Sequence, residues 1–538
     1  MPPIDFTQAT QCLSVLNALN PTDVDDSLST MSVVLDGMCA RPPEPVEHLR
    51  VLEEIRGTLD FVMSQASQRY AARALPLDSP ENERFQNVVT GWALMAKSYA
   101  FIAQRSALDP DFNDKRALLA QRRMLYNARV MLEYHRVRRA LPSGLWLQMH
   151  KLFIAAERAG YAEQRVADAL NDIWGAQSVS ECYITMLLVD TAMPCGRSLR
   201  EQGWIKHWAQ RFAPYCSLQA EDEPLHTKPG QFALACEADF GLRPMALMPP
   251  DLKLRGIDTR RLATHIQSLV AQLKKNVSPA SLGLGEDCVQ PACSRLLVAL
   301  YRPWGYAVAG RKYPRKRANA DVQLCVDLQA IAFFIDGREF MQPNDSRLTS
   351  YGRAQLMHTF RDRAPEDITL EYLQTRALQL GYVADETWQI NDQSLTGYRL
   401  SRTRPGSRLE HRQLLGVRVD ASTPLLLAEV IWLQYQNDNS LQAGISILPG
   451  PAKVLAVRLH PGDRSTRERY RIGFLIPGIP SMDTEASLIV PVGWFLSGRR
   501  IEVYADGRSW FAHMNKLLSR GANFDRVLFS REGDSANR

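Results

Sequence analysis

The stretch that decides the fold is WQINDQSLTGYRL, residues 388–400. It begins as an apolar strand, runs through the pattern Asp-x-Ser-x-x-Gly and leaves as a second strand. Asp392 and Ser394 carry short side chains that can hydrogen-bond at the end of a strand. Gly397 supplies the backbone freedom that a tight corner needs. The stretch therefore predicts a corner between two strands, with polar groups gathered at it.

Strand-like runs follow the corner in regular order. They are rich in branched and aromatic residues and lie at 413–419, 425–434, 441–448 and 454–459. An Asn-Asp-Asn turn at 437–439 fits a hairpin. We expect further strands at 472–476, 487–490, 500–504 and 526–529, and a helix at 510–518. Upstream, residues 321–335 suit a strand, although their second half also fits a helix, and residues 350–380 have a helical pattern.

A basic segment, RKYPRKR, lies at residues 311–317. It contains Arg311 and Arg315 in the spacing Arg-x-x-x-Arg, and Tyr313 and Pro314 stiffen the segment between them. An arginine guanidinium pairs bidentately with phosphate or with a guanine edge, and it can stack on a base. The segment is therefore a candidate anion-binding linker, and a plain solvated charge run is the alternative.

The basic segment, the corner and the strands after it together resemble the PilZ domain over about residues 306–460. PilZ domains are six-stranded β-barrels that bind the bacterial messenger cyclic di-GMP. The resemblance implies that Arg311 and Arg315 grip phosphates and guanines, and that Asp392, Ser394 and Gly397 read the base. One feature departs from the family, since the segment between Arg315 and Asp392 is much longer than in typical members. Either a helical insertion splits the barrel, or the basic run is not the arginine motif.

The N-terminal half has helical periodicity. Apolar side chains recur at three- and four-residue spacing in 92–103, 125–132 and 145–156. We expect Ser143 to cap the third of these helices and Gly160 to close it. Short helices of this kind resemble stacked tetratricopeptide pairs, although no 34-residue period is present. Arg136, Arg138 and Arg139 fit either a solvated helix end or a binding face.

These patterns predict an α+β multidomain protein. Proline- and glycine-rich breaks at 227–250 mark a boundary, and two helices follow, the second stopping at Pro303. The expected parts are an all-helical domain at 1–245, a helical linker at 246–305, a PilZ-like antiparallel β-barrel at 306–462 with a helical insertion at about 338–382, and a strand-rich extension at 463–538. We expect a fragment ending near residue 245 to fold alone.

The composition of the chain indicates which classes of function are unsupported. The 538 residues carry a net charge of +6, which does not by itself indicate nucleic-acid binding. The nine cysteines are scattered, so we expect reduced thiols, no disulfides and a cytoplasmic protein. No apolar run reaches membrane-spanning length and no secretory leader is recognisable. Histidine spacing indicates no metal site.

No catalytic motif stands out, and we expect no enzyme and no cofactor. A nucleic-acid interface at 311–317 is weakly supported, because aromatic side chains are not interleaved with its charges. The leading hypothesis is a bacterial cyclic di-GMP effector whose barrel couples the ligand to a helical module that docks an unknown protein. The alternative is a degenerate PilZ-like adaptor that binds protein partners without nucleotide.

Overall fold

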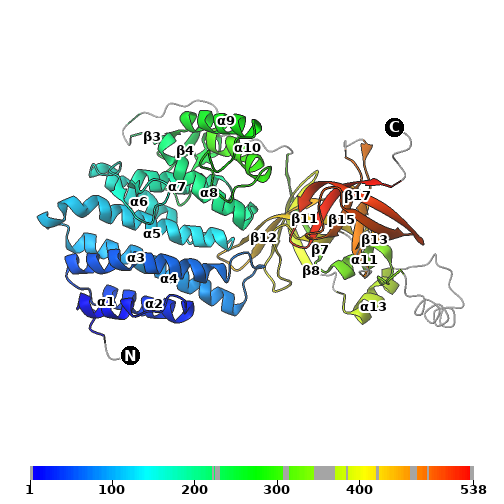
Figure 1. Cartoon of the computed structure of the whole chain (residues 1–538), viewed down its shortest axis with the longest axis horizontal. Coiled ribbons are helices and arrows are strands. Elements are labelled where there is room, and N and C mark those ends of the chain that lie inside the picture. The colour runs from blue at the N-terminus through cyan, green and yellow to red at the C-terminus, as the bar shows by residue number, and fades with distance from the viewer. Residues whose placement is uncertain are drawn as a thin grey trace. The chain divides into compact units, whose positions relative to one another are not determined.

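The chain divides into two compact units. The computed structural model describes residues 4–220, 223, 231–306, 314–343, 370–382, 386–419, 423–460, 469–480 and 484–532. Unit 1 comprises Met1–Arg73 and Leu77–Arg311, and unit 2 comprises Ala74–Pro76 and Lys312–Arg538. Helices dominate unit 1, and two closed antiparallel β-barrels dominate unit 2. The expected α+β multidomain fold class is confirmed (Figure 1).

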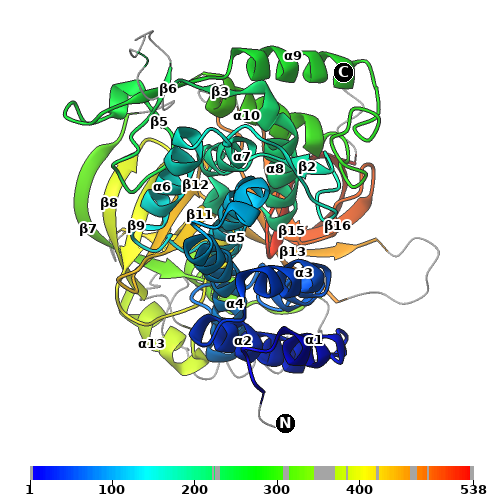
Figure 2. The same cartoon turned by 90° about the vertical axis from the view of Figure 1, so that its left-hand side faces the viewer.

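Helices follow one another through unit 1 in chain order (Figures 1 and 2). They are α1 (Ala9–Asn17), α2 (Val24–Ala40), α3 (Pro45–Gln68), α4 (Ser79–Arg105), α5 (Arg116–Arg136), α6 (Leu145–Arg158), α7 (Val179–Thr191), α8 (Leu199–Phe212), α9 (Arg260–Lys274) and α10 (Ala292–Gly305). Capping boxes begin three of them, at Asp78, Ser178 and Ser198. The apolar face predicted in α4 is buried, with Trp92 and Tyr99 in the core.

The segment expected to be a boundary and a linker belongs to unit 1. Short strands form a sheet in the order β3 (Ser217–Leu218), β6 (Arg255–Asp258), β4 (Phe232–Leu234), β5 (Arg243–Pro244), and a second pair is β1 (Val166–Ala167) with β2 (Ala176–Gln177). The helices α9 and α10 share one apolar core with the earlier helices. The indole of Trp304 donates to the carbonyl of Leu188 at 2.8 Å. A fragment ending near 245 would therefore lose part of this core.

Two helix-end predictions for unit 1 are wrong. Gly144, not Ser143, occupies the N-cap of α6, in a left-handed conformation that glycine adopts without strain. Pro303 lies inside the last turn of α10 and does not stop it. The buried Trp304 just after this proline holds that turn against the core.

The first barrel of unit 2 contains the quoted stretch. Its strand order is β10 (Leu414–Arg418), β11 (Leu426–Tyr435), β12 (Leu441–Ile447), β9 (Gly397–Arg402), β8 (Glu386–Ser394), β7 (Lys316–Cys325), and it closes on itself. Each of these strands pairs antiparallel with its neighbours. Trp388, Ile390 and Leu400 point into the barrel because side chains alternate along a strand.

A helical insertion splits this barrel between β7 and β8. After Cys325 the chain forms α11 (Leu328–Asp336), which Asp327 caps, so the second half of 321–335 is helical. The helix α13 (Leu370–Leu380) ends at Gly381. Residues 344–369, where the helical pattern was also expected, lie outside the described residues. The insertion accounts for the long separation between the basic segment and the corner.

The predicted extension is a second closed barrel. Its order is β13 (Lys453–Leu459), β14 (Arg471–Ile476), β15 (Ser487–Pro491), β18 (Phe524–Arg531), β17 (Arg508–Arg520), β16 (Arg500–Ala505). The strand β13 belongs to this barrel, so the predicted boundary at 462 falls one strand late. The helix expected at 510–518 is wrong, because β17 pairs with strands on both sides. Two register shifts in β17 disturb the alternation by which a strand is recognised in sequence.

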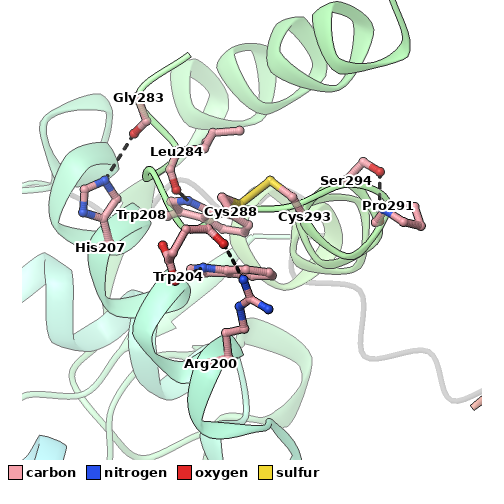
Figure 3. The surroundings of a disulfide bond; sticks show 11 residues. Arg200, Trp204, His207, Trp208, Gly283, Leu284, Cys288, Pro291, Cys293 and Ser294 are labelled. Carbon is pink, nitrogen blue, oxygen red and sulfur yellow. Dashed lines mark hydrogen bonds between the residues drawn. A yellow bond between two sulfur atoms is a disulfide. The ribbon is translucent and has the colours of Figure 1, made fainter. Parts of the chain in front are cut away.

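A disulfide corrects the expectation that every cysteine is reduced. Cys288 and Cys293 are bonded in the loop and first turn that lead into α10 (Figure 3). Their Cα atoms lie 5.6 Å apart, which is within the usual range for a disulfide. The surrounding loop is fixed by two indoles of α8, since Trp204 donates to Asp287 at 2.9 Å and Trp208 donates to the Leu284 carbonyl at 2.8 Å. The sequence spacing of the two cysteines alone did not reveal that the loop between them brings their side chains together.

Candidate functional site

The quoted stretch forms a two-residue hairpin between β8 and β9. Leu395 and Thr396 make the turn, so Ser394 pairs with Gly397 and Asp392 pairs with Arg399. A bulge between Ile390 and Asp392 shifts the register one residue before the corner. Asp392 therefore lies near the end of its strand, opposite an arginine on the neighbouring strand.

Asp392 binds two arginines from different segments. Its Oδ1 atom accepts from Nη1 of Arg315 at 2.5 Å, and its Oδ2 atom pairs with Nε of Arg399 at 3.0 Å. The Asp392 side chain is 13% exposed, whereas those of Arg315 and Arg399 are 26% and 45% exposed. The cluster therefore consists of one largely buried carboxylate and two guanidinium groups that are partly exposed to solvent.

The structure brings Arg315 to Asp392 across 77 positions of sequence. Arg315 directly precedes β7, whose first residues pair with the end of β8. Arg317, exposed on β7, pairs in register with Asp392, so basic side chains flank the aspartate on both neighbouring strands. Arg311, the other predicted arginine, lies outside the described residues.

Ser394 and Gly397 serve the hairpin itself. The hydroxyl of Ser394 donates to the carbonyl of Gly397 at 3.2 Å, which closes the turn. Gly397 is not in the left-handed region, so backbone freedom is not why glycine stands there. Instead β12 passes so close that a Cβ atom at Gly397 would collide with the carbonyl oxygen of Ile445. The barrel's own backbone therefore explains why glycine stands at this position.

Arg399 is a site residue that the sequence prediction missed. A signal for it exists, because a two-residue turn at 395–396 places residues 392 and 399 opposite each other. Opposite charges at facing positions of two antiparallel strands attract. Reading the register outward from the turn identifies Arg399 as the partner of Asp392.

Unit 1 contains a second cluster of arginines around a carboxylate. Arg56 donates two hydrogen bonds to Asp168, at 2.8 and 2.7 Å, and Arg122 donates a third at 3.2 Å. Glu53 bridges the same two arginines, at 3.2 Å to Arg56 and 3.0 Å to Arg122. Arg56, Arg122 and Asp168 are all buried, so this cluster lies in the core.

Burial opposes ionisation of the acids in this core cluster and would raise the pKa of Asp168 and of Glu53. The charges and hydrogen bonds of Arg122 and Arg56 outweigh that effect, and both pKa values fall below the ordinary range. The acids therefore stay ionised in the folded protein.

The described residues hold no group of three or more histidine, cysteine or acidic side chains suited to a metal ion. No helix in the described part of the chain is long and apolar enough to cross a membrane.

Comparison with known proteins gives two family matches. Residues 10–223 match the N-terminal domain of the cyclic-di-GMP receptor FimW, and residues 455–531 match the FimW C-terminal β-barrel domain. The second match coincides with the barrel β13–β18. The first barrel, with the Asp392 corner, lies between these two matches.

A curated protein is similar to most of the chain. The cyclic-di-GMP receptor FimW of Pseudomonas aeruginosa is 24% identical over 525 residues, covering 90% of this chain and 84% of the relative. No solved structure matches the chain.

Proposed function

We propose that this chain is a cyclic di-GMP receptor that binds its ligand at the Asp392 corner of the first barrel. The observation that carries the proposal is the similarity to the FimW receptor, which extends over 90% of the chain. The corner is our choice of site because it joins the two sequence patterns that resemble a PilZ domain. The binding residues would be Arg311, Arg315, Asp392, Ser394 and Gly397, together with Arg399.

The charges at the corner suit a cyclic dinucleotide. Arg315, Arg317 and Arg399 surround the single carboxylate of Asp392, which leaves a local surplus of positive charge. The ligand carries two phosphates, which the arginines can bind, and two guanines. The N–H groups on the guanine edges can donate hydrogen bonds to a carboxylate. Each charge-assisted hydrogen bond contributes roughly 1.5–3 kcal/mol. Four or five of them would support micromolar affinity, about −8 kcal/mol.

The ion pair between Arg315 and Asp392 provides a route for signalling. A phosphate that binds Arg315 would compete with Asp392 for the same guanidinium group, and the basic segment at 311–317 would reorganise around the ligand. The chain passes from unit 1 into unit 2 within this segment, as it also does at Ala74–Pro76. An ordering change in it would alter the helical module, which we propose is the part that docks a protein partner.

The remaining assignments follow from the same proposal. The protein would act in the bacterial cytoplasm, where cyclic di-GMP is made, and it would bind rather than transform its ligand. We propose no DNA partner, no membrane insertion and no resident cofactor.

One observation favours the alternative of an adaptor that binds no nucleotide. Arg315 and Arg399 already have a protein partner in Asp392, so the cluster can stabilise the barrel without any ligand. Under this alternative the corner is a structural ion-pair cluster, and both units serve only to bind proteins.

A titration decides between the two. Isothermal calorimetry of the full chain with cyclic di-GMP should give saturable binding, and cyclic di-AMP and GTP should bind much more weakly or not at all. The adaptor alternative predicts that none of the three nucleotides binds.

A further inference from the structure

A small cavity of about 90 Å³ lies in unit 1 where α5 and α8 face each other beside the end of α7. Contacts join α7 to both of these helices, and all three are seen together in Figure 2. Arg129, Glu133 and Arg136 line the cavity from α5, and Gln202 and Lys206 line it from α8. These residues recur at three- and four-residue spacing, so each helix presents one face to the cavity.

Basic groups outnumber acidic ones around this cavity. Arg129 pairs with Asp60 of α3 at 2.9 Å, and Arg136 pairs with Glu133 at 3.0 Å. Glu133 is further occupied, because Tyr70 donates to it at 2.7 Å. Lys206 is the third cation, half-buried, and makes no hydrogen bond or ion pair with the described residues. One positive charge at the cavity is therefore left without a carboxylate.

A buried histidine also lines the cavity. His135 is 6% exposed, and neither of its ring nitrogens has a hydrogen-bond partner among the residues that the structure describes. Burial lowers its pKa, so the ring is neutral near pH 7, when one of its nitrogens carries a hydrogen that can be donated. An unsatisfied polar ring in a buried position costs free energy, and a bound polar group would recover part of it.

The charge of Lys206 responds to the same surroundings. The repulsion of Arg129 and then burial lower its pKa to about 7, and Arg136 adds to this. Asp60 and Glu133 act in the opposite direction and do not compensate. An anion in the cavity would offset the two arginines and restore the full charge of the ammonium group.

We propose that this cavity binds a small oxyanion of the phosphate or sulfate class, held by Lys206 between Arg129 and Arg136. A cavity of about 90 Å³ is large enough to hold a small tetrahedral oxyanion. Whether Arg136 ends a solvated helix or belongs to a binding face is left open by the sequence, and the cavity favours the binding face. This site is independent of the one proposed on the barrel.

The test uses sodium sulfate and sodium phosphate on the full chain, at ionic strength matched with sodium chloride. Both oxyanions should raise the unfolding temperature in a saturable way at low millimolar concentration. Lys206→Gln should weaken binding on the order of tenfold, because it removes a charged donor. Lys151→Gln, on the exposed face of α6, is the matched control and should bind like the wild type.

Sulfate also gives a pH readout, because its own charge does not change between pH 6 and 8. If only protonated Lys206 binds, a pKa of about 7 makes sulfate bind on the order of tenfold more tightly at about pH 6 than at about pH 8. Lys206→Gln should remove this dependence. Equal stabilisation of wild type and Lys206→Gln, with no pH dependence in either, would overturn the proposal.

A labelling experiment covers the case in which Lys206→Gln does not fold. Limited acetylation of the wild type at pH 7, read by mass spectrometry, should modify Lys206 readily because its amine is partly neutral. Sulfate should slow that modification at least severalfold and leave Lys151 unchanged. Equal rates at Lys206 in sulfate and in chloride would contradict the site.

Discussion

Two clusters in this protein each hold an aspartate between two arginines, one in the core and one near the surface. In unit 1, Asp168 is bound by Arg56 and Arg122 and is 5% exposed. All three side chains are buried, and Glu53 holds the same two arginines from a second side. Charges so placed must be satisfied by one another, because water cannot replace a lost partner. This cluster has no freedom to exchange partners.

At the barrel corner, Asp392 is also bound by two arginines, but both of those reach solvent. Water or a ligand can take the place of the carboxylate at small cost. The difference teaches that an arginine–carboxylate cluster indicates a binding site only when its cations are accessible. The following predictions test that distinction.

The largest effect is expected at the buried cluster. Asp168→Ala leaves the buried Arg56 without its main acceptor and Arg122 without one of its acceptors, which should lower the free energy of unfolding by roughly 3–5 kcal/mol. Urea denaturation followed by circular dichroism measures it. Asp25→Ala, which removes an exposed partner of Arg69, should cost no more than about 1 kcal/mol. Equal losses in the two variants would mean that burial does not distinguish the clusters.

Lowering the pH should reduce the stability that the same buried cluster contributes, by less than the Asp168→Ala substitution does. The pKa values of Asp168 and Glu53 are depressed in the folded protein, so the stability they contribute is complete above their ordinary pKa values. It is lost as the pH falls below about 4 and through the folded-state values. Asp168→Asn, which cannot ionise there, should lose less stability than the wild type between about pH 5 and pH 3 in urea melts. Parallel pH curves for the two proteins would contradict the assignment.

Gly397→Ala tests the structural half of the corner. The added methyl group meets the carbonyl of Ile445 on β12, which is backbone and cannot easily move. Crowding of this kind should lower the free energy of unfolding of the barrel by roughly 1–3 kcal/mol, as measured in thermal melts. Gly493→Ala has open space around it but a left-handed backbone, so it reports the cost of conformation without collision. A neutral Gly397→Ala would mean that β12 does not pack as described.

Ser394→Ala should have the smallest effect. Its hydroxyl makes one hydrogen bond, to the Gly397 carbonyl, and a neutral bond contributes about 1 kcal/mol. If Ser394 also contacts the ligand, affinity for cyclic di-GMP should fall about tenfold in calorimetry. A fall in stability with unchanged affinity would restrict Ser394 to the turn.

The sequence predicted most of the barrel and only part of the corner. The alternation of Trp388, Ile390 and Leu400 is local, so the strands could be recognised without knowing their partners. Arg399 required the hairpin register, and the contact of Arg315 with Asp392 depends on the pairing of β7 with β8, which are far apart in the sequence. In β17, two register shifts interrupt the alternation of side chains that identifies a strand, and the segment was therefore predicted to be a helix. Local periodicity was therefore informative, whereas long-range pairing was not.

The measurement that tests the central claim most directly is a cyclic di-GMP titration of the wild type beside Arg315→Ala. Arg311→Ala and Arg399→Ala extend it, and Arg338→Ala, exposed just after α11, is the control. We expect the wild type and Arg338→Ala to bind alike and Arg315→Ala to lose about a hundredfold, roughly 2–3 kcal/mol. The stability of Arg315→Ala should fall by no more than about 1 kcal/mol, because Arg315 is partly exposed and Asp392 keeps its pair with Arg399. If the wild type binds and Arg315→Ala binds equally well, the ligand occupies another site and the corner is only a structural cluster.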